Sequence, residues 1–234
     1  MPRARRRFQA VLFDLGGTLV DTRDPVGWSS LAASLGVVVD PEHLLHAYDE
    51  VDRSVDGPPP FPPFAEYWRR IFSKAADAEL PLSFAEAFLE RSRALPDVTH
   101  LFSDAKRCLD DLRAQKRRMG VVSNSRSEAA VRAHLARAGI ETYFSLVVSS
   151  GTEGVAKPDR AIFDRAVERL GIPAEATFYV GDLAYWDAIA AKSAGLASVW
   201  LNRYGTGFGE DPPEITSLAE LPEYILAIEG ARVK

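Results

Sequence analysis

The sequence predicts an α/β fold in which a parallel sheet is covered by helices, with an all-helical segment inserted near the start of the sheet domain. After Asp97, short apolar runs alternate with longer helical segments, as in strands joined by right-handed helical crossovers. From about Asp24 to Asp97, apolar residues instead recur at helical spacing. We therefore expect a discontinuous sheet domain of residues 1–23 and 98–234, interrupted by a helical domain of residues 24–97.

The first strand is expected at Ala10-Val-Leu-Phe13, an apolar run that ends at Asp14 and is followed by Gly16 and Gly17. A short buried strand that stops at a glycine turn is the simplest interpretation of this pattern. The inserted segment is expected to form about four helices. Its proline-rich stretch at 56–63 cannot lie inside a helix, because proline lacks the backbone N–H that a helix needs.

The remaining elements follow in alternation after the insert. Helices are expected at 103–116, 127–138, 159–170 and 185–194, and strands at 119–122, 144–148, 177–180 and 198–201. The strands are mostly apolar, which is typical of a parallel sheet buried on both faces. The fold class is therefore α/β with a helical insert.

Composition excludes several classes of protein. The chain is 47% hydrophobic and 26% charged, values ordinary for a globular protein. A net charge of −5 argues against a general nucleic-acid binder, which needs a basic surface. The single cysteine, Cys108, cannot form an internal disulfide and fits a reducing compartment.

The N-terminal segment carries four arginines, Arg3, Arg5, Arg6 and Arg7. The apolar run behind them is too short for a signal peptide and is interrupted by Asp14, so we interpret the segment as a solvated basic tail. No window approaches the roughly 20 apolar residues that span a bilayer. We expect no membrane partner and a cytoplasmic location.

Polar residues follow the ends of the predicted strands. They are Asp14, Ser123-Asn124, the loop that leads to Lys157, and Gly181-Asp182. Ligands of open parallel sheets bind at the carboxyl ends of the strands. Two carboxylates at adjacent strand ends would repel, and Mg²⁺ with its oxygen ligands resolves that conflict. Ser123 and Lys157 suit phosphate oxygens, so the sequence predicts a site for magnesium and phosphate.

Four segments in this order resemble the motifs of the haloacid dehalogenase superfamily. They are Phe13-Asp-Leu-Gly-Gly-Thr-Leu-Val-Asp21, Val121-Val-Ser-Asn124, Ala156-Lys-Pro-Asp159, and Gly181-Asp-Leu-Ala-Tyr-Trp-Asp187 with the following 190–195. The resemblance spans nearly the whole chain. It implies a Rossmann-like core with a helical cap domain inserted after the first strand.

The resemblance also implies a nucleophile and a metal site. Asp14 would attack phosphorus and form an aspartyl-phosphate intermediate. Asp14 and Asp182, with the backbone carbonyl of Gly16, would bind Mg²⁺. Asp187 would support the metal through one of its ligands or through water.

The phosphate-binding residues are implied in the same way. Ser123 would bind the transferring phosphoryl oxygens together with nearby backbone N–H groups, for which we nominate Gly17 and Asn124. Lys157 would screen the charge between Asp14 and the phosphate.

One position departs from the pattern of the family's phosphatases. A second aspartate that protonates the leaving group usually lies two residues after the nucleophile, and Gly16 stands there instead. General acid–base help is worth roughly 10²–10⁴-fold in rate. Either another group supplies the proton, the leaving group needs none, or turnover is slow. Candidate acids in the cap are His43, His46, Asp49 and Glu50, and Asp21 is interpreted as a helix cap.

Three functions therefore stay open. The first is a phosphatase of a small phosphorylated metabolite, and the second is a weak or inactive relative that binds a phosphorylated ligand or partner. The third is a phosphonate or haloacid hydrolase. Dehalogenases of the family use no metal, which conflicts with the retained Asp182 and Asp187. A phosphonate hydrolase would need a cap lysine, and Lys74 is interpreted as part of a solvated face. We predict neither substrate identity nor oligomeric state.

Plainer interpretations of some residues also stay open. Lys157-Pro158 could simply mark the start of a helix that has proline at its first position. Asp187 could be a surface residue in the first turn of its helix. Gly205 to Gly209 lacks dinucleotide-binding spacing and is expected to be a loop. His43 and His46 lack a third partner for zinc.

Overall fold

The chain divides into two compact units. The computed structural model describes residues 8–58, 60–203, 205 and 212–231. The core unit comprises Met1–Asp21 and Thr99–Lys234, and the helical unit comprises Thr22–Val98. The basic tail that holds Arg3 to Arg7 and residues 206–209 of the glycine-rich loop lie outside the described residues.

The core unit is built on a six-stranded sheet with the order β5-β4-β1-β6-β7-β8. Its strands are β1 (Ala10–Phe13), β4 (Arg118–Ser123), β5 (Leu146–Ser149), β6 (Thr177–Gly181), β7 (Ala197–Leu201) and β8 (Glu214–Ile215). Every neighbouring pair runs parallel, and β1 lies between β4 and β6. The structure thus confirms the predicted α/β class and its parallel sheet.

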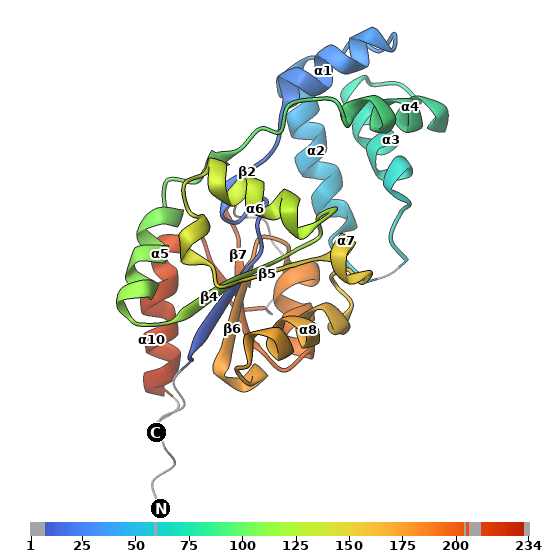
Figure 1. Cartoon of the computed structure of the whole chain (residues 1–234). Helices are drawn as coiled ribbons and strands as arrows, with labels where there is room; N and C mark the ends of the chain where they lie inside the picture. The colour runs from blue at the N-terminus through green and yellow to red at the C-terminus, as the bar shows by residue number, and fades with distance from the viewer. Residues whose placement is uncertain (1–7, 59, 204, 206–211, 232–234) are drawn as a thin grey trace, which may run out of the picture. The chain divides into compact units, whose positions relative to one another are not determined.

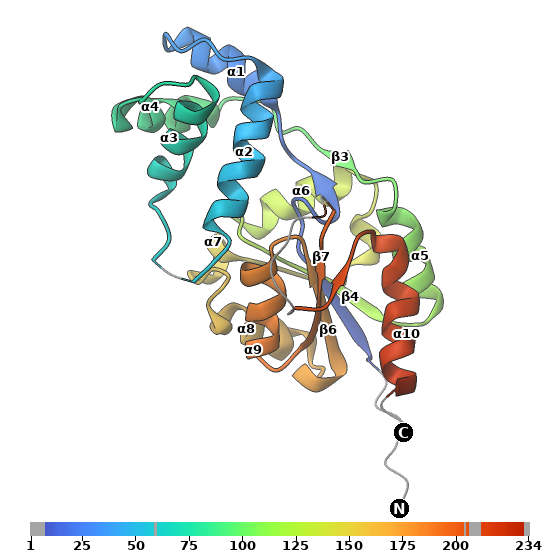
Figure 2. The ribbon, with the colours of Figure 1, turned by 180° about the vertical axis from the view of Figure 1, so that it is seen from behind.

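Helices cover both faces of this sheet (Figures 1 and 2). One face packs against α5 (Ala105–Ala114), α6 (Glu128–Arg137) and α10 (Leu221–Ala231), and the other against α8 (Arg160–Leu170) and α9 (Ala190–Ser193). Successive side chains of β1 point to opposite faces of the sheet, so the strand packs on both. Val11 and Phe13 join the apolar cluster on the first face, and Leu12 joins the cluster on the second. Burying each such side chain contributes about 1.5–3 kcal/mol.

Several short elements complete the core unit. They are β2 (Val20–Asp21), β3 (His100–Leu101), α7 (Ser150–Glu153), the 3₁₀ turns η1 (Glu141–Tyr143), η2 (Ala174–Ala176) and η4 (Leu218–Glu220), and the π-helix η3 (Ala184–Ile189). β2 and β3 pair antiparallel, with Val20 opposite Leu101 and Asp21 opposite His100. The chain therefore leaves and re-enters the core unit through a two-stranded ribbon.

Two elements differ in detail from the sequence expectation. The helix expected at 185–194 begins with the wider turns of η3 and becomes α-helical only at Ala190. The strand expected at 144–148 begins at Leu146, because the η1 turn still holds Phe144 through its N–H bond to the Glu141 carbonyl. Neither difference changes the order of the elements.

The helical unit contains α1 (Pro25–Ser34), α2 (Pro41–Val55), α3 (Phe64–Ala75) and α4 (Leu82–Ser92). The first two start at an aspartate cap followed by proline, since Asp24 and Asp40 accept backbone N–H groups of the first turn. The unit has a core of its own, in which Phe72 and Phe88 pack with ring centroids 4.6 Å apart. The proline-rich stretch lies between α2 and α3.

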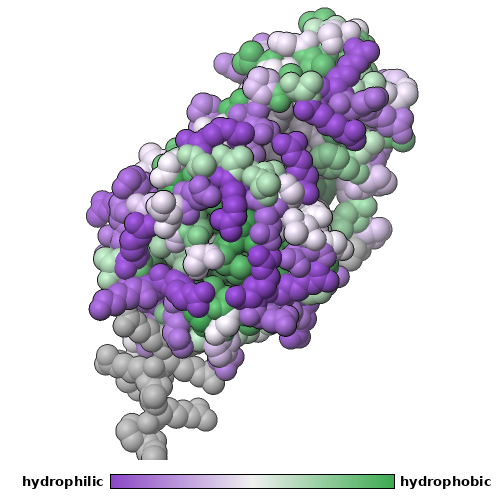
Figure 3. All heavy atoms as spheres, in the orientation of Figure 1, coloured by the Kyte–Doolittle hydropathy of each residue, from purple (hydrophilic) through white to green (hydrophobic). Residues whose placement is uncertain are grey.

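Hydrophilic residues are spread over the visible face of the core unit (Figure 3). Within the described part of the chain, no helix combines the length and the apolar character needed to cross a membrane.

Candidate active site

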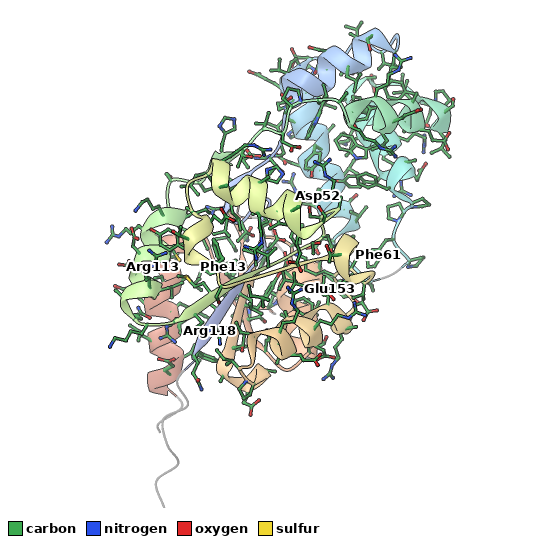
Figure 4. The ribbon with its side chains drawn as sticks, in the orientation of Figure 1. Phe13, Asp52, Phe61, Arg113, Arg118 and Glu153 are labelled. Atoms are coloured by element: carbon green, nitrogen blue, oxygen red, sulfur yellow. The ribbon has the colours of Figure 1, made fainter. Side chains whose placement is uncertain are left out.

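The polar residues predicted at strand ends meet at one edge of the sheet. Phe13, labelled in Figure 4, lies inside the core unit as the last residue of β1, and Asp14 follows it. Ser123 ends β4 and Gly181 ends β6, the two strands on either side of β1. Because parallel strands end at the same edge, their following residues gather there.

Lys157 lies at the centre of this group. Its ammonium Nζ is 2.6 Å from Asp14 Oδ1 and 2.6 Å from Asp187 Oδ1. All three side chains are at least nine-tenths buried. Burial alone would lower the pKa of Lys157, but the carboxylates of Asp14 and Asp187 outweigh it and raise the pKa above its ordinary value. Lys157 is therefore a buried cation held between two acids.

Asp14 has an altered pKa in this setting. Burial raises the pKa of Asp14 to about 6, the Lys157 ammonium opposes the rise, and the charge of Asp187 adds to it. The backbone N–H of Asp14 bonds to the Val180 carbonyl at 2.9 Å, which ties it to β6. A second cation beside Asp14 would favour its ionised form.

Asp182 approaches the turn that follows β1. The hydroxyl of Thr18 donates to Asp182 Oδ1 over 3.0 Å. Gly17 has φ +74°, and a Cβ there would lie 2.0 Å from Asp182 Oδ2, so any other residue would be strained and would displace Asp182. The Gly17 N–H bonds to the Val20 carbonyl, and Gly16 forms an isolated bridge with Val20. The two glycines therefore shape the turn against which Asp182 lies.

Asp187 is buried, with only 1% of its side chain exposed, which excludes the plainer interpretation of a surface residue. It fits beneath Gly181, where a Cβ would lie 2.2 Å from the Asp187 carboxyl carbon. Its Oδ2 accepts the N–H of Leu183 over 3.1 Å. Asp187 lies within the wide turns of η3, and such turns are frequent at functional sites.

Three carboxylates are close enough to share a metal ion. One carboxylate oxygen from each of Asp14, Asp182 and Asp187 lies within 4.8 Å of the other two. The donors are all oxygens, as Mg²⁺ prefers, and none is the nitrogen or sulfur that typifies zinc sites. The residues fit a magnesium ion, with the carbonyl of Gly16 as a further predicted ligand.

The predicted phosphate-binding residues differ in their availability. Among the described residues, the Ser123 hydroxyl has no hydrogen-bond partner, so it is available to a phosphoryl oxygen. The Asn124 side chain is engaged, since it donates to the Lys157 carbonyl over 2.9 Å and accepts the Lys157 N–H over 2.8 Å. Asn124 thus holds the lysine loop, and substrate contacts by Asn124 and Gly17 stay predictions.

Two residues of the group had no role in the sequence analysis. Thr18 belongs to the first motif, and its position there is the signal that could have suggested its contact with Asp182. Tyr179 lies within the apolar run of β6, where nothing distinguishes it from a core residue. Its hydroxyl bonds to Asp187 Oδ1 over 2.8 Å and lies 3.3 Å from Lys157 Nζ. Burial, with the charges of Asp187 and Asp14, raises the pKa of Tyr179 well above 10, so the phenol is neutral.

Three of the four acids considered in the helical unit, His46, Asp49 and Glu50, have side-chain partners within that unit. Asp49 accepts from Arg23 over 2.6 Å. Glu50 lies 2.6 Å from the Lys74 ammonium and 3.4 Å from His46. The Lys74 side chain is therefore half-exposed and ion-paired, which is consistent with a solvated face.

A family model described as haloacid dehalogenase-like hydrolase matches residues 8–195. The chain is 40% identical over 133 residues to the haloacid dehalogenase-like hydrolase domain-containing protein 3 of Danio rerio, covering 54% of this chain and 53% of that protein. The match thus spans about half of that relative's length.

Two further relatives match over more of their length. A glyceraldehyde 3-phosphate phosphatase of Methanothermobacter thermautotrophicus is 29% identical over 199 residues, covering 83% of this chain and 85% of that protein. The crystal structure of a HAD phosphatase from Thermococcus onnurineus superposes with a TM-score of 0.61 at 28% identity, covering 93% of this chain and 97% of that one.

Proposed function

Because the chain belongs to the haloacid dehalogenase-like hydrolase family, we propose that it is a magnesium-dependent phosphatase of a small phosphorylated metabolite, with Asp14 as its nucleophile. The observation that carries the proposal is the buried arrangement of Lys157 between Asp14 and Asp187, next to Asp182. The phosphatases among its relatives add support.

The reaction assigns a task to each residue. A carboxylate oxygen of Asp14 forms a bond to phosphorus while the bond from phosphorus to the leaving oxygen breaks. Water then attacks the phosphorus of the aspartyl phosphate, which frees Asp14 and releases inorganic phosphate. Ser123 donates a hydrogen bond to a phosphoryl oxygen, and the positive charge of Lys157 offsets the charges of Asp14 and the phosphate. Mg²⁺, when bound, supplies positive charge that offsets the charge of the phosphate.

The glycine at position 16 limits which phosphate compounds the protein can hydrolyse efficiently. A strongly basic leaving oxygen, such as that of an alkyl phosphate, takes up a proton as it departs, and no side chain at position 16 can donate it. Asp49 and Glu50 are engaged in ion pairs with Arg23 and Lys74 within the helical unit. We therefore propose that the best substrates carry leaving groups of low basicity, such as acyl or aryl phosphates, because these depart without protonation.

The absence of an acid at Gly16 also favours a second function, a protein that binds a phosphorylated ligand with little turnover. The haloacid and phosphonate alternatives have less support. Asp182 and Asp187 suit a metal that dehalogenation does not use, and Lys74 is ion-paired rather than a free amine.

A panel of phosphorylated metabolites, acyl phosphates and an aryl phosphate, each assayed with Mg²⁺ and with EDTA, tests the proposal. Magnesium-dependent release of inorganic phosphate is the expected result. Release that persists in EDTA would contradict the magnesium requirement. Tight binding of a panel member by calorimetry without release would favour the binding function.

A further inference from the structure

Tyr179 occupies a fully buried place beside the acidic cluster. It lies in β6, and its ring packs edge-on against Phe163 with centroids 5.1 Å apart. Its hydroxyl makes the contacts with Asp187 and Lys157 described above, and it lies 3.5 Å from the Val122 carbonyl. The contact with Asp187 Oδ1 is the shortest of the three, so the hydroxyl donates its single proton to Asp187.

The hydrogen bonds of Asp187 limit what its carboxylate can offer. Each carboxylate oxygen accepts about two hydrogen bonds. Oδ1 accepts from Lys157 Nζ at 2.6 Å and from Tyr179 Oη at 2.8 Å, whereas Oδ2 accepts only the Leu183 N–H among the described residues. The remaining acceptor position of Asp187 is therefore on Oδ2.

The number of N–H donors limits the hydrogen bonds of Lys157 in the same way. Its ammonium has three N–H donors. Among the described residues, Nζ has three acceptors, which are Asp14 Oδ1, Asp187 Oδ1 and Tyr179 Oη. Without the phenol oxygen, one donor of a buried cation loses its partner, and the ammonium is free to tilt away from Asp14.

We propose that Tyr179 is a positioning residue that saturates Oδ1 of Asp187, so that Oδ2 faces the metal site, and that holds the Lys157 ammonium on Asp14. The inference rests on the proposed magnesium site but adds a residue to it. Tyr179 touches neither the phosphate nor the metal. It acts through Asp187 and Lys157.

The test is Tyr179→Phe in the full chain. Phenylalanine keeps the ring and its packing on Phe163, so only the hydroxyl is lost. The expected result is a 10- to 100-fold weaker affinity for Mg²⁺ alone, measured by calorimetry, as is typical when a partner of a metal ligand is removed. The Mg²⁺ concentration that half-activates aryl phosphate hydrolysis should rise by the same factor, with little change in KM.

The core unit offers a matched control in Tyr143. Its hydroxyl lies 2.5 Å from Asp110 Oδ1, and Lys106 lies 2.8 Å from Asp110 Oδ2, which repeats the Tyr-Asp-Lys arrangement on the surface. Tyr143→Phe removes the same group and should leave the affinity for Mg²⁺ unchanged.

The outcomes separate this inference from the proposed function. If the unaltered protein binds no Mg²⁺, the proposed function fails. If it binds Mg²⁺ and Tyr179→Phe binds equally well, the positioning role is overturned and Tyr179 is a core residue. A crystal structure of the unaltered protein with Mg²⁺ tests the inference without any variant. Tyr179 Oη should remain on Asp187 Oδ1, and an Asp187 that has turned Oδ1 to the metal would contradict it.

Discussion

The Lys157 ammonium contacts Asp14 Oδ1 at 2.6 Å with both side chains buried. The same ammonium contacts Asp187, so removal of one acid still leaves the lysine a negative partner. A buried ion pair that loses one partner costs about 3–5 kcal/mol when nothing replaces it. The second contact should reduce that cost when Asp14 is altered.

Asp14→Asn should therefore remove turnover while the protein still folds. The amide cannot attack phosphorus, so magnesium-dependent hydrolysis of an aryl phosphate should fall to background. Circular dichroism checks that the fold is retained. Asp164→Asn is a control, because Asp164 lies on the exposed face of α8 and pairs with Arg160. Undiminished hydrolysis by Asp14→Asn would remove Asp14 from the mechanism.

Gly16→Asp should restore an acid to the position where phosphatases of the family carry one. Hydrolysis of alkyl phosphates should rise, by up to roughly 10²–10⁴-fold, because their leaving groups need protonation. Hydrolysis of an aryl phosphate should change far less, and the ratio of the two rates in the variant and the unaltered protein is the measurement. No gain with alkyl phosphates would mean that the acid comes from elsewhere.

Gly17→Ala should weaken magnesium binding by displacing Asp182. The added Cβ would lie 2.0 Å from Asp182 Oδ2, in a backbone conformation of φ +74° that alanine rarely adopts. Gly171→Ala is matched in strain, with φ +67°, but has no atom within 4 Å of the added group. Both variants should lose stability, and only Gly17→Ala should lose affinity for Mg²⁺ by calorimetry. Equal affinities would show that Asp182 tolerates displacement.

Stabilisation by Mg²⁺ should depend on pH through Asp14. Its pKa of about 6 in the folded, metal-free protein exceeds the value of 3.8 expected when unfolded. The protonated form of Asp14 thus contributes stability that is complete below pH 3.8 and is lost as pH rises through about 6. Mg²⁺ competes with this proton, so it binds more weakly below pH 6.

The melting temperature with Mg²⁺ and with EDTA, measured at pH 5 and pH 7.5, checks this expectation. The gain from Mg²⁺ should be larger at pH 7.5. Asp14→Asn should abolish most of the difference between the two pH values. An equal gain at both values in the unaltered protein would contradict the role of Asp14 as a titrating ligand.

The fold was largely predictable because its signals are local. Short apolar runs ending in Asp14, Ser123 and Gly181 mark strands, and parallel strands share one edge, so the gathering of these residues follows from topology alone. The widened turns of η3 were not predicted, since the sequence analysis distinguished helix from strand by apolar spacing and not one type of helix from another.

Side-chain partnerships inside the site were harder to predict. Tyr179 sits in an apolar run, and only the three-dimensional register brings its hydroxyl to Asp187. The two hydrogen bonds between the Asn124 side-chain amide and the backbone of Lys157, 33 residues apart in sequence, were not predicted. Neither contact has a periodic signature in the sequence.

The antiparallel pairing of β2 with β3 has a consequence for the architecture as a whole. It places Asp21 and His100 side by side, so excising everything between them would leave two ends that a tight Asn-Gly hairpin could join. Other domains could therefore be inserted between Asp21 and His100 in place of the helical unit. Their length could vary widely without a change in the strand register of the six-stranded sheet.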